Sequence, residues 1–175
     1  MRRKFFIALL LIVIAILIIT LLRLKDFHPF VKLSSPSKSR LLNLAKTQEE
    51  NKEYLLAKET YQKLIKHYPH SASVSNWQRH IEEINIKLLF SPLIHPGSMI
   101  YEVKPGDTLA KIAKEFNTTV DLIMKSNNLE SSNIRPGQKI KVVTCPFSVI
   151  VDKSQNILML KTGDEIIKTY IVSTG

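Results

Sequence analysis

The 175-residue chain contains one cysteine, Cys145. A single cysteine cannot form a disulfide within the chain, and no group of cysteines and histidines has the spacing of a zinc site. Disulfide scaffolds and structural zinc modules are therefore excluded, and we predict neither a metal site nor a cofactor. A large enzyme is also excluded, because this length allows about one domain or several small ones.

Acidic residues are few, with 15 Asp and Glu against 25 Lys and Arg. The excess lies in residues 1–98, which hold 15 basic and 7 acidic side chains. A nucleic-acid-binding protein is expected to gather its basic residues on one face among stacking aromatic side chains. Here they are scattered at helix-surface spacing or lie beside an apolar run, so we predict no nucleic-acid partner.

The longest apolar run covers residues 5–22, in which 17 of 18 residues are apolar and none is charged. As a helix it would be about 27 Å long, close to the roughly 30 Å of the hydrocarbon core. The basic residues 1–4 predict a cytoplasmic N-terminus. The alternative is a cleaved signal peptide, but no small-x-small cleavage site follows. We therefore expect a single-pass signal anchor in the cytoplasmic (inner) membrane, with the remainder in the periplasm or facing the cell wall.

Residues 23–39 carry prolines and serines without periodicity, which is typical of a linker. Residues 40–90 then show apolar side chains at three- and four-residue steps, which predicts three helices. The first two are separated near Glu50 and Asn51, and Ser71 or Ser73 can cap the third. His67, His70 and His80 lie here without a paired carboxylate at ligand spacing, so we interpret them as surface residues.

The first two of these helices resemble one tetratricopeptide-type helix pair. The resemblance rests on Leu41, Leu44, Ala45, Ala57, Tyr61, Leu64 and Pro69. It implies a module that docks a protein partner. The alternative is a helical spacer, because repeat arrays usually need about three units to bury a continuous core.

Residues 99–143 predict the order strand, helix, helix, strand. A short alternating strand ends at the Pro105 and Gly106 turn, and Asp107 or Thr108 can cap the helix that follows. Thr119 can cap a second short helix. The segment 139–143 then returns as a strand.

This segment resembles a LysM domain over its whole length. The matching residues are Tyr101, Val103, Gly106, Asp107, Thr108, Leu109, Ile112, Ala113, Asn127, Leu129, Ile134, Pro136, Gly137, Gln138 and Ile140. The resemblance implies a two-stranded antiparallel sheet packed on two helices. It also implies binding of polymers that contain N-acetylglucosamine, such as peptidoglycan or chitin.

The same resemblance implies a shallow glycan groove between the loop after the first strand and the loop after the second helix. Carried onto this sequence, it predicts Gly106, Asp107, Thr108 and Leu109 on one wall, and Asn127, Asn128, Leu129, Ile134 and Arg135 on the other. Several of these residues have an alternative structural role in the turn, the helix cap or the core. No carboxylate pair is placed as glycoside hydrolysis requires, so we predict no catalytic residue here.

Residues 146–175 alternate as three strands of a meander. They are similar to the opening strands of the L,D-transpeptidase catalytic domain, which implies peptide crosslinking of peptidoglycan through a cysteine activated by a histidine. Cys145 does not fit that role, because it precedes the first strand and no histidine follows it. The segment is either the start of a longer catalytic domain or a small extension that lies against the LysM-like module.

The sequence thus predicts an α+β protein with a transmembrane helix, a helical spacer, a βααβ module and an incomplete β meander. Its predicted function is peptidoglycan binding, as the N-terminal part of an L,D-transpeptidase. The alternative is a non-enzymatic envelope protein whose helical region binds a partner.

Overall fold

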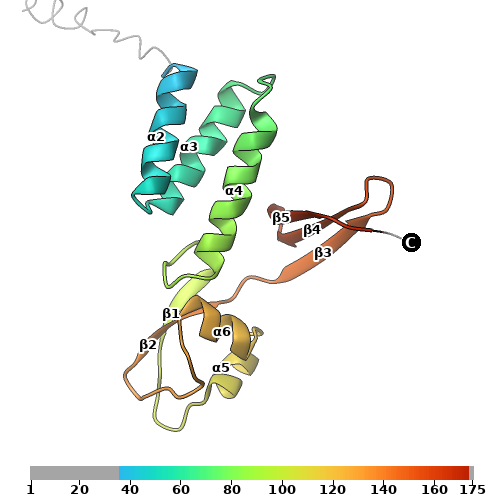
Figure 1. Ribbon diagram of the computed structural model, residues 1–175. Helices are drawn as coiled ribbons and strands as arrows, with labels where there is room; N and C mark the ends of the chain where they lie inside the picture. Colours follow the sequence, from blue (N-terminus) through green and yellow to red (C-terminus); the bar gives the residue numbers. More distant parts are fainter. Residues whose placement is uncertain (1–35, 174–175) are drawn as a thin grey trace, which may run out of the picture. The chain divides into compact units, whose positions relative to one another are not determined.

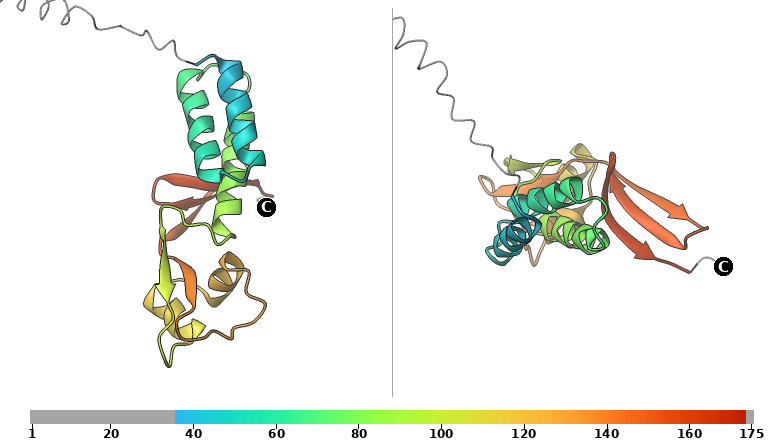
Figure 2. Two further views of the ribbon diagram at one scale, coloured as in Figure 1. Left: turned by 90° about the vertical axis from the view of Figure 1, so that its left-hand side faces the viewer. Right: turned by 90° about the horizontal axis from the view of Figure 1, so that it is seen from above.

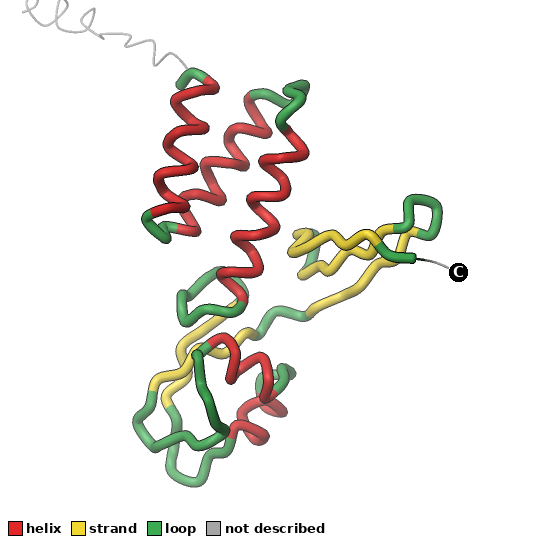
Figure 3. Tube along the Cα trace, in the orientation of Figure 1, coloured by secondary structure: helices red, strands yellow, loops and turns green. Residues whose placement is uncertain are grey.

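The computed structural model describes residues 36–173. Helices α2 (Lys38–Glu50), α3 (Tyr54–His67) and α4 (Val74–Leu89) come first along the chain. The order β1, α5, α6, β2 follows, and strands β3, β4 and β5 come last (Figure 1). Figure 3 shows the same division into an all-helical segment, a mixed segment and an all-strand segment.

The helical region, α2 to α4, is held together by one apolar core. Both views of Figure 2 show these helices side by side. Ala45 and Ala57 are fully buried, and their small side chains let α2 and α3 approach closely. The other core members are Leu41, Tyr61, Leu64, Trp77, Ile81, Ile84 and Leu88.

The βααβ module pairs β1 (Ser98–Glu102) with β2 (Lys139–Val143) in antiparallel register, from Ser98 opposite Val143 to Glu102 opposite Lys139. Helices α5 (Leu109–Glu115) and α6 (Val120–Ser126) supply the rest of its core. Each helix begins where a threonine side chain accepts a backbone N–H of the first turn. Thr108 accepts from Lys111, and Thr119 accepts from Leu122.

Strands β3 (Phe147–Asp152), β4 (Ile157–Thr162) and β5 (Glu165–Ile171) form an antiparallel meander in that order. Only β5 contributes a buried side chain, Ile167. The meander lies against α4 through β5: Asn85 donates to the Ile166 carbonyl over 3.1 Å, and Thr169 donates to Glu82 over 2.8 Å. The meander therefore packs on the helical region, which differs from the predicted alternative of an extension against the βααβ module.

The βααβ module also contacts α4, through a buried lysine. Lys141 on β2 is 1% exposed, and its Nζ donates to the carbonyls of Leu88 (2.6 Å) and Ser91 (2.8 Å). Carbonyls in the last turn of a helix lack partners within the helix, so a donor from another element satisfies them. This contact links β2 to the end of α4.

The predicted fold class is wrong on one point. The described residues form an α+β protein, but no helix among residues 36–173 is long and apolar enough to cross a membrane. The longest, α4, has 16 residues and carries charged side chains. It reaches only about 24 Å, short of the roughly 30 Å hydrocarbon core. The stretch predicted as the transmembrane helix, residues 5–22, lies outside the described residues.

Candidate functional site

An open hollow of about 700 Å³ lies on the βααβ module. It is bordered by the start of α5, the first residue of α6 and the loop that leads from α6 to β2. The lining residues are Asp107, Thr108, Leu109, Ala110, Val120, Ser132, Asn133, Ile134 and Arg135. This volume falls in the range of small-molecule sites, about 300 to 1,000 Å³.

Backbone hydrogen bonds fix the distance between the loop that follows β1 and the loop that leads from α6 to β2. The Val103 N–H donates to the Gln138 carbonyl over 2.9 Å, and the Gly137 N–H donates to the Val103 carbonyl over 2.8 Å. The Gln138 side chain accepts from the Arg135 N–H over 3.0 Å. Gly106 and Gly137 have φ values of 83° and 81°, a left-handed conformation that glycine adopts without strain. The hollow is therefore largely formed before any ligand binds.

Asp107 shapes the first wall. One of its oxygens, Oδ2, accepts from the Tyr101 hydroxyl and from the Lys104 N–H, each over 2.8 Å. The hydrogen bond from the Lys104 amide, with that from Tyr101, lowers the pKa of Asp107. The same contact with Asp107 raises the pKa of Tyr101 to about 12. Asp107 is therefore an ionised acceptor at neutral pH, and Oδ1 is left for a ligand.

Five of the nine predicted wall residues line this hollow: Asp107, Thr108, Leu109, Ile134 and Arg135. Leu109 is only 2% exposed, so its side chain belongs mainly to the core. Gly106, Asn127, Asn128 and Leu129 lie outside the lining. Gly106 forms the turn before α5, Asn128 is exposed with a φ of 54°, and Leu129 packs against the core.

Asn127 has a structural role instead. Its side-chain amide donates to the Lys141 carbonyl and accepts from the Lys141 N–H, both over 2.7 Å. It also donates to the Ile123 carbonyl over 2.7 Å. These bonds fasten the end of α6 to β2, and they occupy the polar groups that a sugar would need.

Sequence reasoning missed four lining residues: Ala110, Val120, Ser132 and Asn133. Ala110 is exposed beside the capping Thr108, and Val120 is the first residue of α6. The run of small polar residues at 131–133 could have indicated Ser132 and Asn133, because such residues are typical of a loop that presents hydrogen-bonding groups. Together the lining offers apolar surface, a hydroxyl, a carboxylate, an amide and a guanidinium.

Comparison with known proteins agrees with this geometry. The family model described as "LysM domain" matches residues 101–143. This range includes the end of β1, helices α5 and α6, and the whole of β2. The chain contains a LysM domain. The match covers the hollow and its supporting hydrogen bonds, so the hollow is a feature of the LysM domain itself.

Two relatives carry cell-wall enzyme names. A Bacillus licheniformis protein named "Putative L,D-transpeptidase YkuD" is 32% identical over 84 residues, which cover 44% of this chain and 51% of that protein. "N-acetylmuramoyl-L-alanine amidase sle1" of Staphylococcus saprophyticus is 55% identical over 42 residues, 24% of this chain and 13% of the relative. The chain therefore spans about half the length of YkuD.

One solved structure was also aligned, that of a MoCVNH3 variant (Mo0v) in complex with (N-GlcNAc)4. It is 24% identical and covers 37% of this chain and 46% of its own, with a TM-score of 0.27.

Cys145 lies at a second, much smaller cavity of about 40 Å³, which His95 also lines. The Nε2 atom of His95 is buried without a hydrogen-bond partner, and burial lowers the pKa of this histidine. A cavity of this size holds one or two water molecules and is too small for a peptide substrate.

One group of side chains in the helical region can ligate a metal ion: Glu49, His80 and Glu83. His80 is half-buried, which differs from its predicted place on the surface. Its carboxylate neighbour Glu49 lies 31 residues earlier in the chain, so the sequence spacing gave no sign of the pair.

Proposed function

We propose that the LysM domain binds the N-acetylglucosamine-containing glycan of peptidoglycan in the hollow between α5 and the α6–β2 loop. The observation that carries the proposal is a preformed hollow of about 700 Å³ with mixed polar and apolar lining. An acetamido sugar offers an amide donor, an acceptor and a methyl group. Asp107, Thr108 and Asn133 suit the polar groups, while Ala110 and Ile134 suit the methyl group.

The test fills the hollow without disturbing the core. Ala110 is exposed on α5, so Ala110→Trp places a large ring in the hollow. Lys114 is exposed on the same helix and does not line the hollow, so Lys114→Trp is the matched control. Full-length chains are incubated with purified insoluble peptidoglycan and sedimented. We expect the unaltered chain and Lys114→Trp in the pellet and Ala110→Trp in the supernatant. Equal sedimentation of the two variants would contradict the assignment.

We further propose that the chain is the N-terminal part of a peptidoglycan L,D-transpeptidase. The similarity to YkuD over 84 residues supports this. So does the exposed apolar surface of the meander: Val149 is 58% exposed, Val151 48% and Ile171 92%. Further parts of a catalytic domain would cover these side chains. The LysM domain would then raise the local concentration of the enzyme at its substrate.

The coding sequence past Gly175 tests this second proposal. We expect the reading frame to continue into a histidine and a Ser-x-Gly-Cys segment. A stop codon directly after Gly175 would contradict it and favour a non-enzymatic envelope protein. In either case we propose that the chain acts on the outer side of the cytoplasmic membrane, because peptidoglycan lies there.

A further inference from the structure

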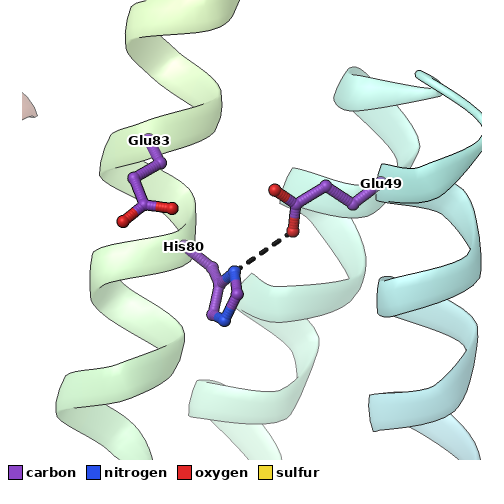
Figure 4. A group of neighbouring side chains, drawn as sticks. All are labelled: Glu49, His80 and Glu83. Atoms are coloured by element: carbon purple, nitrogen blue, oxygen red, sulfur yellow. Dashed lines mark hydrogen bonds and ion pairs between the residues drawn. The ribbon is translucent and has the colours of Figure 1, made fainter.

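Three metal-ligating side chains converge between α2 and α4 (Figure 4). Glu49 lies in the last turn of α2, while His80 and Glu83 lie one turn apart on α4. One ligand atom of each lies within 4.8 Å of the others. The three residues are unrelated to the glycan site, because they belong to the helical region.

The spacing of the first two ligands suits a zinc ion. The distance between Nδ1 of His80 and Oε2 of Glu49 is 3.1 Å. Two ligand atoms bound tetrahedrally to Zn²⁺ at about 2.0 to 2.1 Å lie about 3.3 Å apart. A small outward movement of either side chain therefore admits the ion between them.

Glu83 can supply the third protein ligand by rotation of its side chain. It is exposed and makes no hydrogen bond or ion pair within residues 36–173. Residues three apart on a helix share a face, so its carboxylate can turn toward His80 by side-chain rotation alone. This rotation weakens only its electrostatic attraction to Lys87, which lies one turn further along α4.

Neighbouring groups hold the two inner ligands in place. The imidazole of His80 stacks on the buried ring of Tyr61, with centroids 4.9 Å apart and planes inclined by 9°. Lys87 donates to the other oxygen of Glu49, Oε1, over 2.8 Å. Oε2 faces His80 and also accepts from the Tyr61 hydroxyl over 3.4 Å. A hydrogen bond from a neighbouring side chain orients a ligating carboxylate.

Charge and space also permit a divalent ion. The carboxylates of Glu49, Glu50 and Glu83 outnumber the ammonium groups of Lys46 and Lys87, so the group is net negative when His80 is neutral. A hollow of about 420 Å³, bordered by Glu49, His80 and Lys87, opens beside it. Water can therefore supply a fourth ligand. A donor set of one imidazole and two carboxylates favours a transition metal over calcium or magnesium.

We propose that Glu49, His80 and Glu83 bind one Zn²⁺ ion, which ties α2 to α4 and stabilises the helical region. Because a metal that binds the folded state stabilises it, bound zinc raises the melting temperature.

The experiment uses the full chain after treatment with EDTA and dialysis. Zinc chloride is titrated in by calorimetry, and the melting temperature is recorded with and without the ion. We expect one equivalent of zinc to bind and the melting temperature to rise. His80→Gln should weaken binding at least about tenfold, since even changes to groups behind the ligands cost 10- to 100-fold.

Glu83→Gln distinguishes the loss of a zinc ligand from misfolding. Glu83 is exposed and unbonded, so this variant should fold as the unaltered chain does, yet bind zinc at least about tenfold more weakly. His67→Gln and Glu59→Gln, at exposed positions on α3, should bind zinc normally. The proposal is overturned if zinc produces neither heat nor a melting shift. It is also overturned if Glu83→Gln binds zinc as tightly as the unaltered chain.

Discussion

Replacing Lys141 by methionine tests how the LysM domain is joined to α4. The ammonium group of Lys141 is buried, and it donates to the Leu88 and Ser91 carbonyls. Methionine keeps most of the volume of the side chain but removes the charge and both donors. The Leu88 carbonyl would keep only the Ser91 hydroxyl as a donor, at 3.4 Å. A carbonyl left without a partner costs about 1 to 3 kcal/mol, whereas removal of a buried charge offsets part of that cost.

The dependence on pH separates these two effects. Burial lowers the pKa of Lys141 from the ordinary 10.5 to about 8. Between these values the unfolded chain binds more protons than the folded chain, so the free energy of unfolding rises with pH. From pH 7 to 9.5 the gain amounts to about 2 kcal/mol. A neutral amine still has two N–H groups for the two carbonyls, so the contact survives deprotonation.

Urea unfolding at pH 7 and pH 9.5 provides the measurement, followed by circular dichroism and by fluorescence of Trp77, the only tryptophan. The free energy of unfolding of the unaltered chain should rise by about 2 kcal/mol relative to Lys141→Met. Lys139→Met, at an exposed position on the same strand, should behave as the unaltered chain. An equal difference between the unaltered chain and Lys141→Met at both pH values would show that the Lys141 ammonium group is not destabilised by burial.

Other variants test single contacts by chemical unfolding. Asn127→Ala should lower the free energy of unfolding by roughly 2 to 4 kcal/mol, because it leaves buried backbone groups of Lys141 unpaired. Asn133→Ala, on the exposed loop, should change it by no more than about 0.5 kcal/mol. Gly106→Ala should lower the free energy of unfolding by about 1 kcal/mol, because alanine is strained at a φ of 83° even though its Cβ would meet no neighbour. A change near zero would contradict a role for this left-handed conformation. Trp77→Ala should cost roughly 3 to 5 kcal/mol by opening a cavity in the helical core, and an undiminished stability would count against that core.

Local sequence patterns were sufficient to predict where these helices begin and end. The helix break predicted near Glu50 and Asn51 lies between α2, which ends at Glu50, and α3, which begins at Tyr54. The cap predicted at Asp107 or Thr108 is Thr108. Helix periodicity and capping act over a few residues, so the sequence displays them directly.

Contacts between distant segments could not be predicted. Lys141 sits in a short strand of alternating residues, and nothing nearby in the sequence indicates that the end of α4 covers it. His80 and Glu49 meet only because α2 and α4 both pack on α3. Asn127 fits the LysM pattern, but the pattern does not distinguish a residue that binds sugar from one that holds α6 against β2. Side-chain roles of this kind depend on packing, which spacing along the chain does not encode.

The proposed ligand of the LysM hollow is a polymer of N-acetylglucosamine. Nuclear magnetic resonance of the isotope-labelled chain, titrated with a tetramer of N-acetylglucosamine, tests this proposal most directly. We expect the amide signals of residues 107–110 and 132–135 to shift, while those of Asn127 and Lys141 change little. An absence of shifts, or shifts centred on Asn127 and β2, would contradict it.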